Sequence, residues 1–243
     1  MNYSFLQCGD DALTVHLGDG IDPAINRRVT ALQGAIGSAG LRGITDLIPA
    51  YADLTVCYDC TVISAKALQR QLRRLLDSLS VAGQDRRRVF RLPVCYGGDY
   101  GPDLDFVCHH SGLSAQEVIA LHSASDYLIY MLGFLPGFAY LGGLDPRLHT
   151  PRLDSPRTCI PAGSVGIGGA QTGVYPLASP GGWQLLGRTP VSVFDRQRQE
   201  PILYRAGDLV HFVPISPAEY EEIARAVAAG TYTVQVEEVP VCD

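Results

Sequence analysis

The sequence predicts an α+β domain over residues 1–85, a mainly β part over residues 86–215 that forms a barrel or a sandwich, and a C-terminal helix and strand over residues 216–243. Two patterns predict this fold class. The first part alternates pairs of short apolar runs with amphipathic helical stretches, whereas the second has many short apolar runs between glycine and proline turns. The composition agrees, because 47% hydrophobic and 18% charged residues are typical of a globular protein.

Two strands and a helix open the first domain, for which we expect the order β-β-α-β-β-α. The strands, over residues 3–8 and 12–17, flank the turn-type sequence Gly9-Asp10-Asp11. A helix then begins at Asp22, which can cap it, with Pro23 at the first helical position. Its apolar residues recur at helical spacing and form one stripe: Ile25, Val29, Leu32 and Ile36.

A second pair of strands and a second helix complete this domain. The strands are expected over residues 44–48 and 53–58, and Ser64 can cap the helix that follows. Leucines at helical spacing form the buried face of this helix, and Gly83 closes it.

The barrel part begins with Arg86 to Arg88, which we interpret as a solvated connection into a strand over residues 89–95. After a loop at residues 96–103, the capping box from Ser114 to Glu117 opens a short helix through His122. Further strands are expected over residues 126–132, 164–167, 173–175, 184–188, 191–194 and 209–214. A second capping box, from Ser216 to Glu219, opens the last helix, and a strand over residues 231–239 ends the chain.

The stretch from Tyr130 to Thr189 organises the rest of the chain. Glycine and proline recur every few residues, and aromatic residues lie between them, including the one tryptophan, Trp183. Flexible linkers lack aromatic residues. We therefore interpret this stretch as tight turns that join short strands and carry a binding surface.

Charge and composition exclude several classes of function. The net charge of −6 argues against general nucleic-acid binding, which needs a basic face. No apolar run is long enough to span a membrane, and the N-terminus lacks the pattern of a signal peptide. Seven scattered cysteines without a secretion signal indicate reduced thiols, so a cytoplasmic location is expected.

The glycine-rich run from Gly163 to Gly169 fails the tests for known nucleotide loops. No Gly-Lys-Ser/Thr follows it, and Gln171 stands where a dinucleotide fingerprint needs a small residue. Ala162 to Gly166 nearly matches a nucleophile elbow, but Ala162 replaces the first glycine and no helix follows. Turns between barrel strands are favoured, with anion binding by backbone amides as the alternative.

Several polar side chains are candidates for metal or ligand binding. Cys57 and Cys60 have the spacing of a zinc or redox pair, but no second pair completes four ligands. A structural role is therefore favoured for them, and for Cys95, Cys108, His109 and His110. His149 lies among Arg147, Arg152 and Arg157, which can bind an anionic ligand or can simply be exposed loop charges. Four uncharged polar side chains can orient an amide or hydrogen-bond to loop backbone: Gln171, Thr172, Tyr175 and Gln184.

No paired carboxylates in the stretch from Tyr130 to Thr189 indicate acid–base catalysis. The stretch is therefore better equipped to bind than to catalyse alone.

Four long motifs resemble the family of the 5-oxoprolinase B subunit, also called the KipI-like family or the first subunit of allophanate hydrolase. They are YMLGFLPGFAYLGGLDPRL (130–148), PAGSVGIGGAQTGVYPLASPGGWQLLGRT (161–189), PVCYGGDYGPDL (93–104) and GLSAQEVIALHSA (112–124). The resemblance extends to about Pro214 and implies a cyclophilin-like barrel. It further implies a complex with a carboxyltransferase-like C subunit and a separate A subunit. This complex opens 5-oxo-L-proline to L-glutamate with ATP, which need not contact this chain.

The matched motifs and the chemistry of their side chains define the expected site. His122 and His149 are expected in polar or proton-transfer roles, with no metal. Arg152 and Arg157 would bind an anionic group, although Leu153 stands where a second arginine often follows in the family. The further binding residues are Gly163, Ser164, Gln171, Thr172 and Tyr175. The apolar wall is formed by Phe134, Pro136, Phe138 and Tyr140.

Two other functions remain open from the sequence. One is a carboxyltransferase-type module that acts on urea-like amides with biotin. The other is a KipI-like inhibitor of a histidine kinase.

Overall fold

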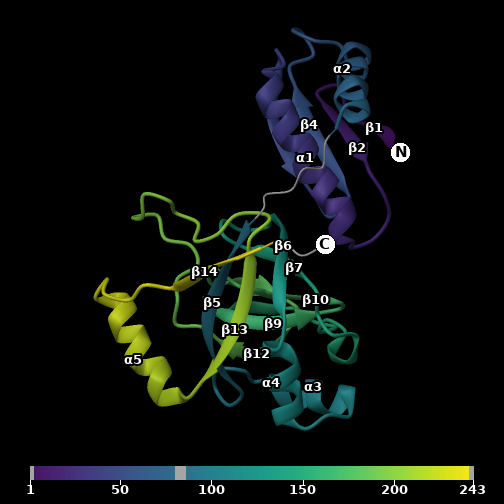
Figure 1. The fold of residues 1–243 in the computed structure, drawn as a ribbon. Coiled ribbons are helices and arrows are strands. Elements are labelled where there is room, and N and C mark those ends of the chain that lie inside the picture. Colours follow the sequence, from purple (N-terminus) through teal and green to yellow (C-terminus); the bar gives the residue numbers. More distant parts are fainter. Residues whose placement is uncertain (1–2, 80–85, 241–243) are drawn as a thin grey trace. The chain divides into compact units, whose positions relative to one another are not determined.

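The computed structural model describes residues 3–79 and 86–240. The chain forms two compact units, one up to residue 85 and one from residue 86 (Figure 1). The first is an α+β unit and the second is a mainly β barrel, so the predicted fold class is confirmed.

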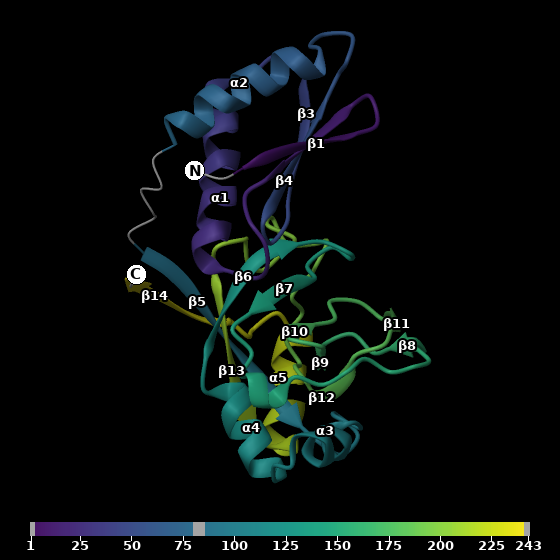
Figure 2. The ribbon, with the colours of Figure 1, turned by 90° about the vertical axis from the view of Figure 1, so that its right-hand side faces the viewer.

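The first unit is a four-stranded antiparallel sheet with two helices on one face (Figure 2). The strands are β1 (Ser4–Cys8), β2 (Ala12–His16), β3 (Ile44–Pro49) and β4 (Asp53–Tyr58), in the spatial order β1-β2-β4-β3. The helices are α1 (Pro23–Ala39) and α2 (Ala65–Asp77). Their apolar faces and the sheet enclose one core that includes Val29, Leu54 and Leu72.

Both helices begin where the capping residues predict. The Asp22 carboxylate accepts a hydrogen bond from the backbone N–H of Ala24 at 2.6 Å, and Ser64 caps α2 in the same way through Ala67. Gly40 ends α1 with a left-handed φ of 56°, which glycine adopts without a steric cost. The helix α2 ends at Asp77, and Gly83 lies outside the described residues.

Seven strands close the barrel of the second unit. They are β5 (Arg86–Tyr96), β6 (Asp126–Leu132), β7 (Ala139–Gly142), β9 (Ser164–Gly168), β10 (Gln171–Val174), β12 (Gln184–Arg188) and β13 (Leu209–Ile215). Their order is β12-β9-β10-β7-β6-β13-β5, and the pairing of β12 with β5 closes the ring. Side chains fill the interior of the closed barrel. Leu92, Ile129 and Val165 are among them, and each is fully buried.

Helices and short strands surround the barrel. α3 (Leu104–Ser111) and α4 (Ala115–Ser123) pack beside each other, and the short 3₁₀ helix η1 (Pro146–Leu148) contacts both. A separate small sheet pairs β8 (Arg157–Ile160) with β11 (Ser179–Gly181) and lies to one side of the barrel (Figure 2). α5 (Pro217–Ala228) and β14 (Gln235–Pro240) follow the last barrel strand, and β14 pairs with β5. The C-terminal segment is therefore part of the second unit.

The structure corrects three sequence-based expectations. Arg86 to Arg88 are the start of β5, because carboxylates from distant segments hold them in an extended chain: Arg88 pairs with Asp208 at 2.6 Å, and Arg86 pairs with Glu238 on β14. Residues 191–194 form no strand and contribute only an isolated bridge. The last strand is confined to Gln235–Pro240.

Candidate functional site

An aromatic pocket lies within the stretch from Tyr130 to Thr189. Its cavity measures about 130 Å³. It is lined by Phe134, Phe138, Tyr140, Arg152, Tyr175, Gly181, Gly182 and Trp183. Phe138 lies at the centre, with its ring centroid between 5.2 and 5.6 Å from those of four aromatic neighbours, all edge to face. This geometry is the favoured one for aromatic pairs, so the rings support each other around the cavity.

Glycines make room for these rings. A Cβ atom at Gly168 would lie 2.3 Å from Nε1 of Trp183, and one at Gly181 would lie 2.5 Å from the hydroxyl of Tyr175. Such contacts are not tolerated between non-bonded atoms, so both positions require glycine. The glycines of the central stretch therefore shape the pocket wall as well as the turns.

Arg152 provides the positive charge of the pocket. Its guanidinium lies 5.9 Å from the centroid of the Trp183 ring, within the range of a cation–π contact. The side chain is exposed, and it forms no ion pair or hydrogen bond with the described residues. A guanidinium without a carboxylate partner can bind an anion through two parallel hydrogen bonds.

Arg157 has an internal role instead. Its Nη2 donates to Asp103 at 2.7 Å, and its Nη1 donates to the carbonyl of Trp183 at 3.4 Å. The second oxygen of Asp103 accepts the backbone N–H of Leu185 at 2.7 Å. The pair therefore fixes the segment that carries Trp183, and the Arg157 charge is already balanced.

Phe134 occupies an unusual backbone position at the rim of the pocket. Its φ is 65°. Apart from glycines, Phe134 is the one residue in the described part of the chain that has a positive φ. Its ring is also 65% exposed, so burial does not offset the strain. Strained residues of this kind cluster at functional sites. Pro136 is exposed in the same turn and does not line the cavity.

His122 lies in the barrel core, away from the pocket. It is fully buried, and its two ring nitrogens each lie 2.8 Å from a hydroxyl, that of Tyr96 at Nδ1 and that of Thr172 at Nε2. Since the Thr172 hydroxyl donates to the carbonyl of Gly166, we assign the proton to Nε2 and the acceptor role to Nδ1. Burial lowers the pKa of His122 to about 3, so the ring is neutral at ordinary pH.

The other predicted residues do not line the pocket. His149 is exposed after η1, next to Arg147, whose guanidinium pairs with Asp145 at 2.7 Å. Ser164 and Thr172 are fully buried in β9 and β10, and Gln171 is half-buried at the start of β10. Ser164, Gln171 and Thr172 therefore belong to the barrel wall.

The glycine-rich run uses its backbone amides internally. The N–H of Gly163 donates to the carbonyl of Tyr175 at 2.7 Å, and that of Gly169 donates to Thr150 at 2.8 Å. Ser164 N–H donates to Pro161 at 3.3 Å. With these three donors occupied, the geometry favours the turn role over anion binding.

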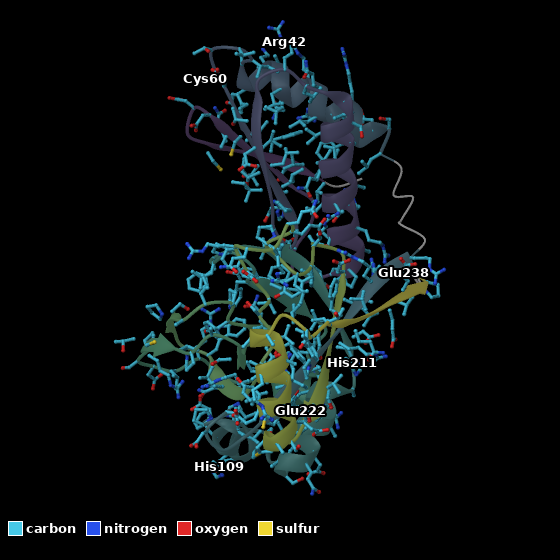
Figure 3. All side chains as sticks on the ribbon, turned by 90° about the vertical axis from the view of Figure 1, so that its left-hand side faces the viewer. Arg42, Cys60, His109, His211, Glu222 and Glu238 are labelled. Carbon is cyan, nitrogen blue, oxygen red and sulfur yellow. The ribbon has the colours of Figure 1, made fainter. Side chains whose placement is uncertain are left out.

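No metal ligand set is found among residues 3–79 and 86–240. Cys60 follows β4 on the exposed tip of the first unit, and His109 is exposed on α3 (Figure 3). None of the helices described is both long and apolar enough to cross a membrane.

Sequence reasoning missed Trp183, Gly181 and Gly182 as pocket residues. The turn-rich pattern predicts a buried Trp183, but not one that faces a ligand site. The available signal was its position as the one tryptophan of the chain, directly after a Gly-Gly pair. The pocket does bring together Phe134, Phe138, Tyr140, Arg152 and Tyr175.

Comparison with known proteins identifies the family. The family model "Carboxyltransferase domain, subdomain C and D" matches residues 3–204. A Bacillus subtilis (strain 168) protein, named as the B subunit of 5-oxoprolinase, is 42% identical over 230 residues, which cover 90% of this chain and 96% of that protein. Its namesake in Escherichia coli O157:H7 is 45% identical over 207 residues, covering 85% and 93%.

A solved structure shows the same fold. The Kluyveromyces lactis urea carboxylase superposes with a TM-score of 0.82 over 98% of this chain and 24% of that one, at 24% identity. The sequence matches and the fold lead to one assignment. The chain belongs to the carboxyltransferase subdomain C and D family and, within it, to the family of the 5-oxoprolinase B subunit.

Proposed function

We propose that this chain is a non-autonomous subunit of an ATP-dependent 5-oxoprolinase. The complete enzyme opens 5-oxo-L-proline to L-glutamate, and a carboxyltransferase-like C subunit and a separate A subunit complete it. Relatives of 42% and 45% identity carry the name of such a component, which supports the proposal. The exposed free thiols of Cys8, Cys60 and Cys159 support a reducing, cytoplasmic location.

The aromatic pocket is the observation that carries the proposal. It contains a free cation and apolar rings, but its lining residues include no carboxylate, histidine, cysteine or serine. Tyr175 is its one weakly acidic group besides Tyr140, and burial raises the pKa of the Tyr175 hydroxyl. The pocket can therefore bind and orient a ligand, whereas nucleophilic and acid–base groups must come from elsewhere, as in a divided active site.

The chemistry explains why such an enzyme needs several parts. A lactam is a poor electrophile, so the amide oxygen is first phosphorylated by ATP. Water then adds to the activated carbon, the ring C–N bond breaks, and the nitrogen takes a proton. A second water molecule releases phosphate and leaves the new carboxylate. Binding of the substrate and control of water can be divided between subunits.

A carboxyltransferase-type module is the second candidate. The family model favours it, because its description names a carboxyltransferase domain, and the chain shares its fold with a urea carboxylase. In that case the chain would act on a urea-like amide, with carboxylated biotin as the donor.

Reconstitution separates the candidates. The chain is purified with the products of its neighbouring genes, and glutamate formation from 5-oxo-L-proline is measured with and without ATP. We expect ATP-dependent turnover only with the complete set. No turnover with that set, combined with carboxylation of urea by a biotinylated partner, would replace the first proposal with the second.

A further inference from the structure

We propose that the aromatic pocket binds a small five-membered ring that carries a single carboxylate, with the carboxylate on Arg152 and the ring against Trp183 and Phe138. The identification of this ligand as 5-oxo-L-proline rests on the proposed function. The binding chemistry itself rests on the pocket.

The size of the pocket selects a small ring. The cavity measures about 130 Å³. Pockets for larger ligands measure roughly 300–1,000 Å³. A five-membered ring fits this volume, whereas a nucleotide does not. The aromatic walls favour a compact ring over a flexible chain, because the protein rings are held edge to face around a narrow space.

The charges select a carboxylate. Arg152 is the one charged residue that lines the cavity. The nearby Arg157 cannot share this role, because Asp103 holds it at 2.7 Å. The ligand therefore meets one uncompensated guanidinium, which suits a single carboxylate better than a phosphate chain. A neutral amide such as urea would leave this charge without a partner.

A neutral hydrogen-bond donor lies in the same wall. Burial raises the pKa of the Tyr175 hydroxyl, and this effect outweighs the opposite effects of a hydrogen bond from the Trp183 backbone and of the Arg152 and Arg157 charges. The hydroxyl therefore keeps its proton and can donate to the amide oxygen of a lactam. Phe134, exposed and strained at the rim, provides an apolar surface for the open side of the ring.

The single tryptophan makes the proposal directly measurable. Trp183 is the one tryptophan of the chain and lines the pocket, so its fluorescence reports ligand binding without any enzymatic assay. The full chain is titrated with 5-oxo-L-proline, with cyclopentanecarboxylate, which lacks the amide, and with 2-pyrrolidinone, which lacks the carboxylate. We expect saturable signals for the two carboxylates and binding at least about tenfold weaker for 2-pyrrolidinone, since hydrogen bonds to a charged group are the strong ones.

Two arginine variants form the matched pair. Arg152→Gln removes the proposed anchor, and Arg147→Gln removes an exposed arginine that pairs with Asp145 outside the pocket. We expect Arg152→Gln to weaken 5-oxo-L-proline binding at least about tenfold and Arg147→Gln to leave it unchanged. In the reconstituted complex, Arg152→Gln should raise KM for 5-oxo-L-proline by a similar factor.

The outcomes keep this proposal separate from the proposed function. If the complex turns over 5-oxo-L-proline with an unchanged KM in Arg152→Gln, the pocket is not the substrate site, although the function stands. If the complete complex is inactive on 5-oxo-L-proline while the Trp183 signal still follows the carboxylate ligands, the pocket assignment stands and the proposed function fails.

Discussion

The second unit contains two clusters in which polar side chains meet aromatic rings, and they are built in opposite ways. Around His122 every polar atom has a protein partner, and the ring is sealed in the core and stacked on Phe212 at 4.7 Å. Around Arg152 the charge is exposed and has no ion-pair or hydrogen-bond partner among the described residues. The difference teaches that a polar residue beside aromatic rings indicates a site only when its hydrogen-bonding capacity remains available.

The largest expected effect is on the sealed cluster. His122→Ala should lower the free energy of unfolding of the second unit by about 3 kcal/mol, because it leaves a cavity and deprives the hydroxyls of Tyr96 and Thr172 of a partner. Urea unfolding followed by Trp183 fluorescence measures this, since Trp183 lies in the same unit. The control is His149→Ala at an exposed position, with an expected change within about 0.5 kcal/mol. Equal losses of unfolding free energy in His122→Ala and His149→Ala would contradict the assignment of His122 to a sealed, fully hydrogen-bonded cluster.

The two arginines of the site should also separate. Arg157→Gln should cost about 1.5 kcal/mol, because it breaks the pair with Asp103, whose carboxylate is mostly buried. Arg152→Gln should change stability by less than about 0.5 kcal/mol, since it loses an exposed cation–π contact with Trp183 but no ion pair or hydrogen bond with the described residues. The same unfolding experiment tests both. A larger loss of stability in Arg152→Gln than in Arg157→Gln would reverse our assignment of the two residues.

The pH dependence of stability sharpens the assignment of His122. Its pKa is about 3 in the folded state, below the ordinary value of 6.5, so the unfolded chain takes up a proton first as the pH falls. The stability contributed by neutral His122 is therefore complete above pH 6.5 and is lost below it. Between pH 7.5 and 5.5 the wild type should lose about 1.4 kcal/mol relative to His122→Gln. Parallel pH profiles of the two proteins would mean that His122 can be protonated in the folded state.

The smallest expected effect on stability concerns the rim of the pocket. Phe134→Asn should change the free energy of unfolding by less than about 0.5 kcal/mol, because asparagine tolerates a positive φ and the ring it replaces is largely exposed. Binding of 5-oxo-L-proline should nevertheless weaken severalfold. Leu177→Asn, at another exposed apolar position, is the control and should alter neither property. Unweakened binding in Phe134→Asn would remove Phe134 from the site.

Elements with local signals could be predicted from the sequence. The capping boxes at Ser114 and Ser216 place α4 and α5, because the N-cap and the glutamate three residues later hydrogen-bond each other. The helix α3 was missed because Asp103 before it makes no side-chain cap and instead binds Arg157 and Leu185. These two partners of Asp103 lie 54 and 82 positions away in the sequence, so no local pattern shows them.

The site could be predicted only in part, because some of its residues are recognisable locally whereas their partners lie far away in the sequence. The aromatic residues and Arg152 are recognisable by type in a turn-rich stretch, and five of the predicted site residues line the pocket. Arg152 and Arg157 look equivalent in the sequence, and only the distant carboxylate of Asp103 separates them. The sequence predicts a polar role for His122. Its hydrogen-bond partners, Tyr96 on β5 and Thr172 on β10, lie on barrel strands distant in the sequence, so its burial could not be predicted.

The most direct test of the central claim uses the single tryptophan indole. Trp183 should give one indole N–H signal in a nitrogen–proton correlation spectrum of the labelled chain. We predict that 5-oxo-L-proline shifts this signal in a saturable way, and that Arg152→Gln abolishes the shift at the same ligand concentrations. A signal that does not move with the wild-type chain in the reconstituted complex, under conditions in which that complex produces glutamate, would contradict our account of the pocket.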